Sequence, residues 1–247
     1  MPDRIGIIQT QKIGDLIIAL PIADFYIEQG AEIFWPIRPA YRRAFQAAKP
    51  DIRFLEVPDK GEGMYAIPHE MLTQHQCSPI FTLYSYLARS SVTDEGLARH
   101  LKFDEYKYAI AHVPFARKWN LTLQRDMQRE MALHQRLNIT RPYLCVHLEG
   151  SNLKLNGQLP DEWTRDLQLV NVTAMTDNPF DWIYTLEHAA RLVLIDSCFS
   201  NLVEQLNLPN EKYLVLRSGL QVTPVMRNGW RFLVPEISGQ AAALRLI

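Results

Sequence analysis

Gln9-Thr10-Gln11-Lys12-Ile13-Gly14-Asp15-Leu16-Ile17-Ile18-Ala19-Leu20-Pro21 is the stretch that decides the fold. The apolar run Ile5–Ile8 precedes it and has the length of a buried strand. An apolar segment from Leu16 to Ile27 follows it and ends at Gly30, which favours a helix. Strand, polar turn and helix form the first half of a βαβ unit, and such turns lie at the carboxyl end of a parallel sheet, where α/β proteins bind ligands. On position alone, Asp15 is best interpreted as a helix cap that complements the helix dipole.

The composition is that of a globular protein. The chain has 247 residues, which fits one large domain or two small ones, and 47% of them are hydrophobic, enough for a proper core. Its formal net charge of −1 gives no global basic footprint for nucleic acid or membrane. Cys77, Cys145 and Cys198 show no paired spacing, and the amino terminus leads directly into a strand without a signal peptide. We therefore expect reduced thiols in a cytoplasmic protein, with no transmembrane segment because Pro21 and Asp24 interrupt the most apolar run.

Strand-like and helix-like segments alternate along the whole chain, which favours parallel sheets with helices on both faces. In the first half, we predict strands at 31–37, 52–57, 80–84 and 106–113, and helices at 40–48, 64–75 and 93–101. In the second half, we predict strands at 143–147, 167–173, 192–195, 213–216 and 230–234, and helices at 179–190, 199–207 and 238–246. A helix from Leu123 to Leu137 separates the two halves. The predicted organisation is a Rossmann-like domain at 1–121, a linker helix at 122–141, a second Rossmann-like domain at 142–235, and a C-terminal helix at 236–247 that can pack back on the first domain.

Two loops in the second half suit a phosphate group. The first is Glu149-Gly150-Ser151-Asn152-Leu153-Lys154, where backbone N–H groups and an ammonium follow a predicted strand. The second is Asp196-Ser197-Cys198-Phe199-Ser200-Asn201, where hydroxyl side chains open a helix after a buried strand. Each loop alone is more simply interpreted as an ordinary polar loop or a helix cap. Two such loops in one half, with an acid in the other half, are less expected by chance.

The sequence gives no sign of a metal site. There is no Asp-x-Asp motif, and the three cysteines lack the spacing of zinc ligands. We therefore expect no metal and no bound cofactor.

Taken together, these motifs resemble family-nine glycosyltransferases of the heptosyltransferase type, which have the GT-B fold. In that family, a strand and a turn ending in Gly-Asp precede an apolar helix with Leu-Pro, which corresponds here to Gly14-Asp15 and Leu20-Pro21. A later signature follows a strand, and its counterpart here is Asp196-Ser197-Cys198-Phe199-Ser200-Asn201. The resemblance implies an α/β, GT-B-like protein, with two Rossmann-type domains whose parallel sheets face each other across a cleft.

The same resemblance implies roles for individual residues. Asp15 would be the general base that takes a proton from an acceptor hydroxyl, and Gln11, Lys12 and Gly14 would contact the acceptor. A nucleotide-sugar donor would bind the second half without a metal ion. Its site would comprise Glu149, Gly150, Ser151, Asn152, Lys154, Asp196, Ser197, Ser200 and Asn201. Among these, Lys154 and the helix start near Ser197 would hold the diphosphate leaving group.

Several alternatives remain open at the level of sequence. The acceptor is either a glycan of the lipopolysaccharide type or a modified, hydroxymethylated base in DNA, as in bacteriophage. Five basic residues near predicted strand ends would favour DNA if they gathered on a cleft rim, namely Arg38, Arg42, Arg43, Arg117 and Lys118. The chain could instead be a non-catalytic module that binds nucleotide-sugars, or a GT-B-like sugar-nucleotide epimerase. The sequence does not indicate the oligomeric state.

Overall fold

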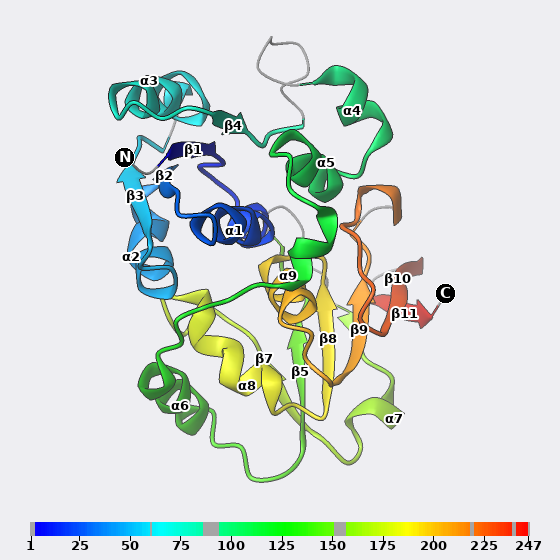
Figure 1. Ribbon diagram of the computed structural model, residues 1–247. Helices are drawn as coiled ribbons and strands as arrows, with labels where there is room; N and C mark the ends of the chain where they lie inside the picture. The colour runs from blue at the N-terminus through cyan, green and yellow to red at the C-terminus, as the bar shows by residue number, and fades with distance from the viewer. Residues whose placement is uncertain are drawn as a thin grey trace. The chain divides into compact units, whose positions relative to one another are not determined.

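The computed structural model describes residues 3–59, 61–85, 94–150, 157–217, 220–238 and 241–246 (Figure 1). The chain divides into two compact units, Met1–Gln124 and Arg125–Ile247. The segment 122–141, predicted as a linker, contains one helix that lies within the second unit, α6 (Met127–Arg136).

The first unit is a parallel sheet with helices. Its elements are β1 (Arg4–Ile8), α1 (Ile13–Ile27), β2 (Glu32–Ile37), α2 (Pro39–Ala48), β3 (Ile52–Glu56), the 3-10 turn η1 (Gly61–Met64), α3 (Ala66–Gln74), β4 (Ile80–Thr82), α4 (Glu95–His100), α5 (Phe103–Ile110) and the 3-10 turn η2 (Phe115–Trp119). The strand order is β3-β2-β1-β4, and every neighbouring pair is parallel. The order reverses between β1 and β4, so the carboxyl ends of these two strands form the topological switch point, where open α/β sheets bind ligands.

Helix α1 is the centre of the first unit. Every residue from Leu16 to Asp24 is buried, and the helix packs against β2, α5 and η2. A helix that is covered on most of its circumference is apolar all round, as this one is. Its first turn is the part that reaches solvent, since Lys12 is exposed and Ile13 to Asp15 are half-buried.

The segment 106–113 was predicted as a strand, and this prediction is wrong. The structure has helix α5 there, beginning at Phe103. Two acids, Asp104 and Glu105, occupy its first turn, and Glu105 Oε2 accepts the backbone N–H of Lys102 at 2.9 Å. This helix-start chemistry and the packing of α5 on α1 outweigh the aromatic and β-branched pattern of the segment.

The second unit has a larger sheet. Its elements after α6 are β5 (Tyr143–His147), β6 (Gly157–Gln158), α7 (Asp161–Thr164), β7 (Gln168–Asn171), the 3-10 turn η3 (Pro179–Trp182), α8 (Ile183–Glu187), β8 (Arg191–Ile195), α9 (Cys198–Gln205), β9 (Glu211–Val215), the 3-10 turn η4 (Leu220–Val222), β10 (Trp230–Ser238) and β11 (Ala241–Leu246). Helix α6 packs against η3 and α8. The strand order is β6-β11-β10-β9-β8-β5-β7, and the five strands from β10 to β7 are parallel. Here the order reverses between β5 and β8.

The parallel strands of the second unit are apolar on both faces. Cys145, Leu192 and Leu214 belong to one buried cluster, and their chain neighbours Leu144, Val193 and others to a second cluster on the opposite face. Side chains alternate along a strand, so a strand buried on both faces reads as a continuous apolar run. Those runs are what made the strands of this unit readable in the sequence.

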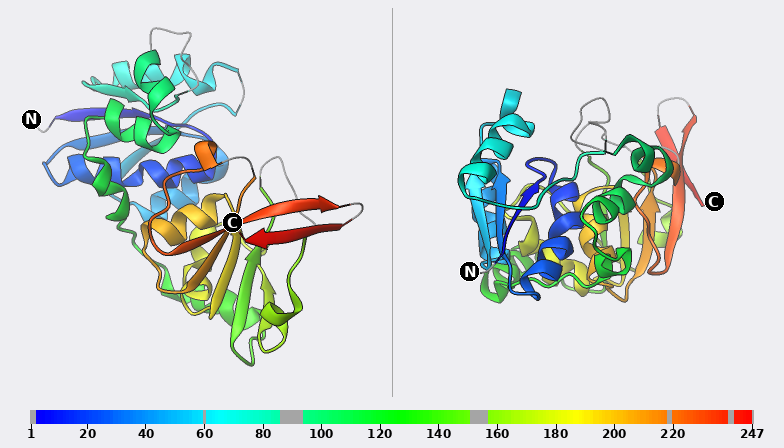
Figure 2. Two further views of the ribbon diagram at one scale, coloured as in Figure 1. Left: turned by 90° about the vertical axis from the view of Figure 1, so that its right-hand side faces the viewer. Right: turned by 45° about the horizontal axis from the view of Figure 1, so that its top comes forward.

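The C-terminal helix predicted for 236–247 is also wrong. β10 extends to Ser238, and Ala241–Leu246 form β11, which pairs antiparallel with β10 (Figure 2). The run Ala241-Ala242-Ala243-Leu244 has high helix propensity, but the hydrogen bonds offered by the edge of β10 decide its structure. In the parts of the chain that the structure describes, no helix is both long and apolar enough to cross a membrane.

Candidate functional site

Asp15 lies at the switch point of the first unit. It is in the first turn of α1, which follows β1 after the turn Gln9–Lys12. Its side chain is 16% exposed, so the carboxylate is accessible and not enclosed in the core. An acid in the first turn complements the helix dipole, as the sequence predicted. The prediction that Asp15 caps the helix is wrong, because the N-cap residue is Lys12 and Asp15 lies inside the first turn. The structure adds a second partner for it.

That partner is Lys107, a buried lysine from α5. Its side chain is 3% exposed, and its Nζ lies 3.9 Å from Asp15 Oδ1. Nζ also donates to Gln9 Oε1 at 2.7 Å and to the carbonyl oxygen of Leu83 at 3.0 Å. Burial lowers the pKa of Lys107, while the charges of Asp15 and Asp104 oppose that shift. The sequence analysis missed Lys107 because it took the segment for a strand.

The turn before α1 is fixed to the ends of neighbouring strands. The backbone N–H of Thr10 donates to the Tyr84 hydroxyl at 2.7 Å, and the Thr10 and Tyr84 hydroxyls lie 2.9 Å apart. Trp35 Nε1 donates to the Gln9 carbonyl oxygen at 2.8 Å, and the Gln9 amide donates to the Gln11 carbonyl oxygen at 3.0 Å. These bonds join the carboxyl ends of β1 and β4, with Trp35 from β2.

Gln11 and Lys12 form the accessible part of this turn. Lys12 has φ 65° and ψ 98°, a conformation that costs energy for a residue other than glycine. Gln11 Oε1 accepts a hydrogen bond from Arg38 Nη2 at 2.6 Å, and Arg38 also donates to the Asp59 carbonyl oxygen. The turn therefore brings Gln11, Lys12 and Gly14 near Asp15, as their order in the sequence requires.

The second unit has a polar site at its own switch point. His147 ends β5 and Ser197 follows β8, and His147 Nδ1 lies 3.2 Å from Ser197 Oγ. The His147 ring packs edge-on against Phe199, with ring centroids 4.8 Å apart. Burial lowers the pKa of His147 to about 4, so the imidazole is neutral at pH 7. His147 is the last residue of the strand predicted at 143–147 and was not predicted as a site residue; its position at the end of that strand is the signal in the sequence.

Ser200 and Asn201 face inward. Ser200 is fully buried, accepts the Ser197 N–H and donates to the Ser197 carbonyl oxygen, both at 2.9 Å. The Asn201 amide also donates to that carbonyl oxygen at 2.9 Å. Ser197 itself is half-buried at the surface of the turn. These contacts hold the turn at Ser197 in place. Among Ser197, Ser200 and Asn201, Ser197 is therefore the residue that lies at the surface of the turn.

The other predicted donor-binding residues fall into three groups. Asp196 is buried at the end of β8, and Arg217 Nη2, after the end of β9, lies 3.7 Å from its Oδ2. Glu149 is exposed and Gly150 half-buried after the end of β5. Ser151, Asn152 and Lys154 lie outside the described residues. Arg217 is a cation at the carboxyl edge of the sheet that sequence analysis did not select.

Most of the basic residues considered for DNA are engaged by acids. Arg38 and Arg42 pair with Asp59 and Glu56, with N–O distances of 3.7 and 3.0 Å. Arg117 pairs with Glu28, and Lys118 pairs with Asp104 at 2.7 Å with both side chains fully buried. Lys118 therefore cannot reach a phosphate backbone.

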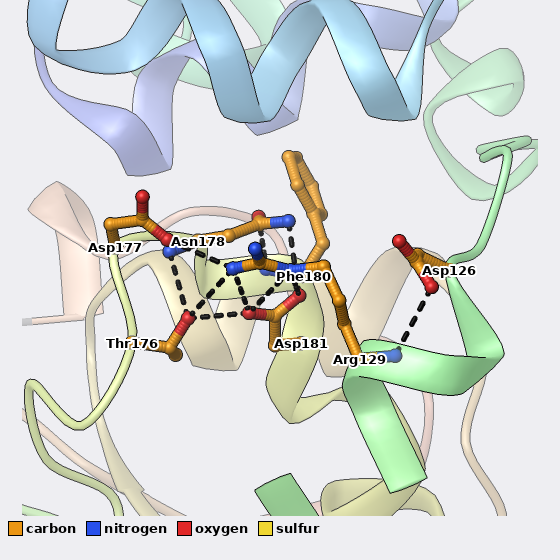
Figure 3. A network of polar contacts seen from close by, with 7 residues as sticks. All are labelled: Asp126, Arg129, Thr176, Asp177, Asn178, Phe180 and Asp181. Carbon is orange, nitrogen blue, oxygen red and sulfur yellow. Dashed lines mark hydrogen bonds and ion pairs between the residues drawn. The ribbon is translucent and has the colours of Figure 1, made fainter. Parts of the chain in front are cut away.

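A further polar cluster ties α6 to the segment after β7 (Figure 3). Arg129 donates to both carboxylate oxygens of Asp181 through Nε and Nη2, and its Nη2 also donates to Asp177 Oδ1 at 2.9 Å. Thr176 and Asn178 donate to Asp181 as well. Asp181 is almost fully buried and its acceptor sites are filled, so we interpret the cluster as structural.

Over the described ranges, no three His, Cys, Asp or Glu side chains gather in a way that could hold a metal ion. Burial raises the pKa of the Cys198 thiol to about 12, so this cysteine next to Ser197 is protonated at neutral pH.

No protein-family model and no curated protein sequence matches this chain significantly. Solved structures do resemble it. The crystal structure of the glycosyl transferase family 9 from Veillonella parvula has a TM-score of 0.61 at 13% identity, over 96% of this chain and 88% of that one. E. coli ADP-heptose lps heptosyltransferase II has a TM-score of 0.58 at 12% identity, over 98% and 92% of the two chains. E. coli heptosyltransferase WaaC, solved with ADP, has a TM-score of 0.55 at 13% identity, over 94% and 93%. The chain therefore has the α/β GT-B fold, as the resemblance in its motifs implied.

Proposed function

We propose that this chain is a glycosyltransferase that moves a sugar from a nucleotide-sugar donor to an acceptor hydroxyl, with Asp15 as the general base. The observation that carries the proposal is the placement of Asp15 in a GT-B-type fold. An accessible carboxylate lies at the switch point of the first unit, in the first turn of its central helix. Similar structures in this fold are glycosyltransferases, and one of them was solved with ADP.

In the proposed reaction, the acceptor oxygen attacks the anomeric carbon of the donor. A bond forms between this oxygen and the anomeric carbon, and the bond from the anomeric carbon to the β-phosphate oxygen breaks. The acceptor proton passes to the Asp15 carboxylate, and the nucleoside diphosphate leaves with the electron pair. For this step, the carboxylate must come within hydrogen-bond reach of the acceptor hydroxyl. We assign the contacts on the acceptor side to Gln11, Lys12 and Gly14.

We assign the donor to the second unit, at the switch point between β5 and β8. Negative charge builds on the diphosphate as it leaves, so groups that donate hydrogen bonds to the diphosphate contribute most to the rate. The candidate hydrogen-bonding groups are the Ser197 hydroxyl, the amino end of α9, and the loop from Glu149 to Lys154. Ser200 and Asn201 act by holding the Ser197 turn. His147 supports Ser197 Oγ as a neutral partner, and we assign no metal to the reaction.

The acceptor that we propose is a sugar hydroxyl. The alternative, a modified DNA base, requires a surface of available cations to bind the phosphate backbone. Arg42 and Arg117 are paired with acids and Lys118 is buried, which favours the sugar. Binding of duplex DNA with a steep dependence on salt concentration would reverse this choice.

The first experiment is a thermal-shift screen over nucleoside diphosphates and nucleotide-sugars. A ligand present at 100 times its dissociation constant stabilises the folded state by about 2.7 kcal/mol, which raises the melting temperature by roughly 5–11 °C in a chain of this size. We expect at least one nucleoside diphosphate and its sugar conjugates to give such a shift. The absence of any shift across the panel would contradict the proposal.

The second experiment compares Asp15→Asn with Asp51→Asn, an exposed acid that follows α2. With the best donor of the screen, we expect Asp15→Asn to lose roughly 10²- to 10⁴-fold in turnover, because the acceptor proton has no base, and to keep its donor affinity. Asp51→Asn should behave as the wild-type protein.

Unchanged turnover in Asp15→Asn would reject its role as base. Donor binding without any turnover would indicate a non-catalytic binding module, and conversion of the donor without nucleotide release would indicate an epimerase.

A further inference from the structure

We propose that Lys107 is a positioning residue for Asp15: its buried ammonium holds one carboxylate oxygen in place and leaves the other for the acceptor hydroxyl. The inference rests on the proposed function, because it assigns Asp15 the role of base. It adds a residue from a different element, α5, to the machinery of the site.

The first reason is the arrangement of partners around Lys107 Nζ. An ammonium group has three N–H donors and no acceptor. Two of these donors are used by Gln9 Oε1 at 2.7 Å and the Leu83 carbonyl oxygen at 3.0 Å, and Asp15 Oδ1 lies 3.9 Å from Nζ, within ion-pair range. Gln9 is itself fully buried, and its amide is held by the Gln11 carbonyl oxygen, so its Oε1 is directed at Nζ.

The second reason is the energetic cost of the lysine. A charged group removed from water is retained only where opposite charge and hydrogen bonds compensate it. Two carboxylates act on the charge of Lys107: Asp104, which is fully buried and ion-paired with Lys118, and Asp15, whose Oδ1 lies within ion-pair distance of Nζ. The Phe103 ring lies 5.8 Å from Nζ. An apolar residue of the same length would fill the same space without this cost. We therefore infer that the positive charge of Lys107 serves the site, and Asp15 is the partly exposed acid that pairs with it.

The third reason is where Lys107 is anchored. Gln9 follows β1 and Leu83 follows β4, so Nζ is fixed to the ends of both strands that border the switch point. Through this contact, the carboxylate of Asp15 is held relative to the sheet as well as by its own helix. Misplacement of a catalytic group by about 1 Å can cost on the order of 100-fold in rate, so such an anchor matters to a base.

The experiment is a double-mutant cycle with Lys107→Met, Asp15→Asn and the double variant, using the donor found in the thermal-shift screen. Methionine keeps the length of the stem and removes the charge. We expect Lys107→Met to lower kcat roughly 10- to 100-fold, with the donor dissociation constant unchanged within about twofold. In the Asp15→Asn background, the same substitution should cause no further loss of kcat, because the base that it positions is already absent.

Lys49→Met is the matched control. Lys49 is also buried and paired with an aspartate of α1, Asp24, but it contacts Thr122 and not the turn at Asp15. We expect Lys49→Met to lower the melting temperature and to leave kcat unchanged at a temperature where it is folded. A wild-type kcat in folded Lys107→Met, or equal losses of kcat in both Asp15 backgrounds, would overturn the inference.

The stability of the same four proteins separates this inference from the proposed function. If the ion pair exists, the changes in the equilibrium constant for unfolding of the first unit, which contains both residues, will be coupled by roughly tenfold. Should the wild-type protein turn over no donor, the proposed function fails while a measured coupling still supports the positioning of Asp15 by Lys107. Independent, additive effects on unfolding would overturn the inference whatever the activity.

Discussion

At the scale of single residues, His147 gives the clearest dependence on pH. Burial lowers its pKa to about 4 in the folded protein, against about 6.5 in an unfolded chain. Below pH 6.5 the unfolded chain therefore binds a proton that the folded state does not, so stability falls as the pH drops from 6.5 to 4. The contribution is fully present above pH 6.5, and at ~1.4 kcal/mol per pKa unit its loss amounts to about 3 kcal/mol.

His147→Gln should remove this part of the pH dependence, because glutamine keeps a hydrogen bond to Ser197 without titrating. The measurement is urea-induced unfolding at pH 7 and pH 4.5 for the wild-type protein, His147→Gln and the exposed control His100→Gln. The wild-type protein and the control should lose stability more steeply than His147→Gln. Identical losses in all three proteins would contradict the assignment of a buried neutral His147.

The positions of residues were predictable where they follow readable strands. The apolar runs on either side placed Gln11, Lys12, Gly14 and Asp15 in a turn between β1 and α1, whereas the roles of these residues came from the family resemblance and stay predictions. Lys107 was missed because it lies in α5, and the residue pattern from Tyr106 to Val113 is typical of a strand. A side chain that reaches a site from a distant element leaves no local signal in the sequence.

At the scale of elements, the attachment of α6 to its unit rests on a partly buried ion pair. Asp181 keeps bonds from Thr176 and Asn178 when Arg129 is removed, but its charge stays buried without a cation. We expect Arg129→Met to lower the free energy of unfolding by about 2 kcal/mol, a moderate value because the Arg129 side chain is 39% exposed. The check is chemical denaturation. Asp177→Asn is the control, since Asp177 is 64% exposed and its loss should cost less than ~1 kcal/mol.

The elements themselves were largely predictable, and the two errors have one cause. Continuous apolar strands and helices with apolar periodicity gave β1 to β4 in the first unit and β5, β7, β8, β9 and β10 in the second, whereas the short strand β6 was not predicted. The segments of α5 and β11 have local preferences opposite to their structures, and contacts with α1 and with β10 decided them. Strand order, and hence the place of each switch point, could be expected only from the fold that the motifs resembled.

At the scale of the whole molecule, two compact units imply more than one cooperative transition. We assigned the donor to the second unit, so a nucleoside diphosphate should raise the melting temperature of that unit's transition in calorimetry. Arg129→Met identifies this transition, because the substitution lies in the second unit and should lower it. A ligand that raised the other transition instead would place the donor site in the first unit.

The contacts that buried Asp24 and Lys49 make with the exposed Thr122 limit where the chain can be divided. Lys49 donates to Asp24 and to the Thr122 hydroxyl and carbonyl oxygens, and Gln124 donates its N–H to the Ala48 carbonyl oxygen. An amino-terminal fragment that ends at 121, the predicted boundary, lacks the Thr122 hydroxyl that contacts Lys49 and Asp24. A fragment that ends at 124 keeps this contact and the bond from the Gln124 N–H to the Ala48 carbonyl oxygen. Limited proteolysis should accordingly spare the peptide bonds between 121 and 124 and cleave this connection only after 124.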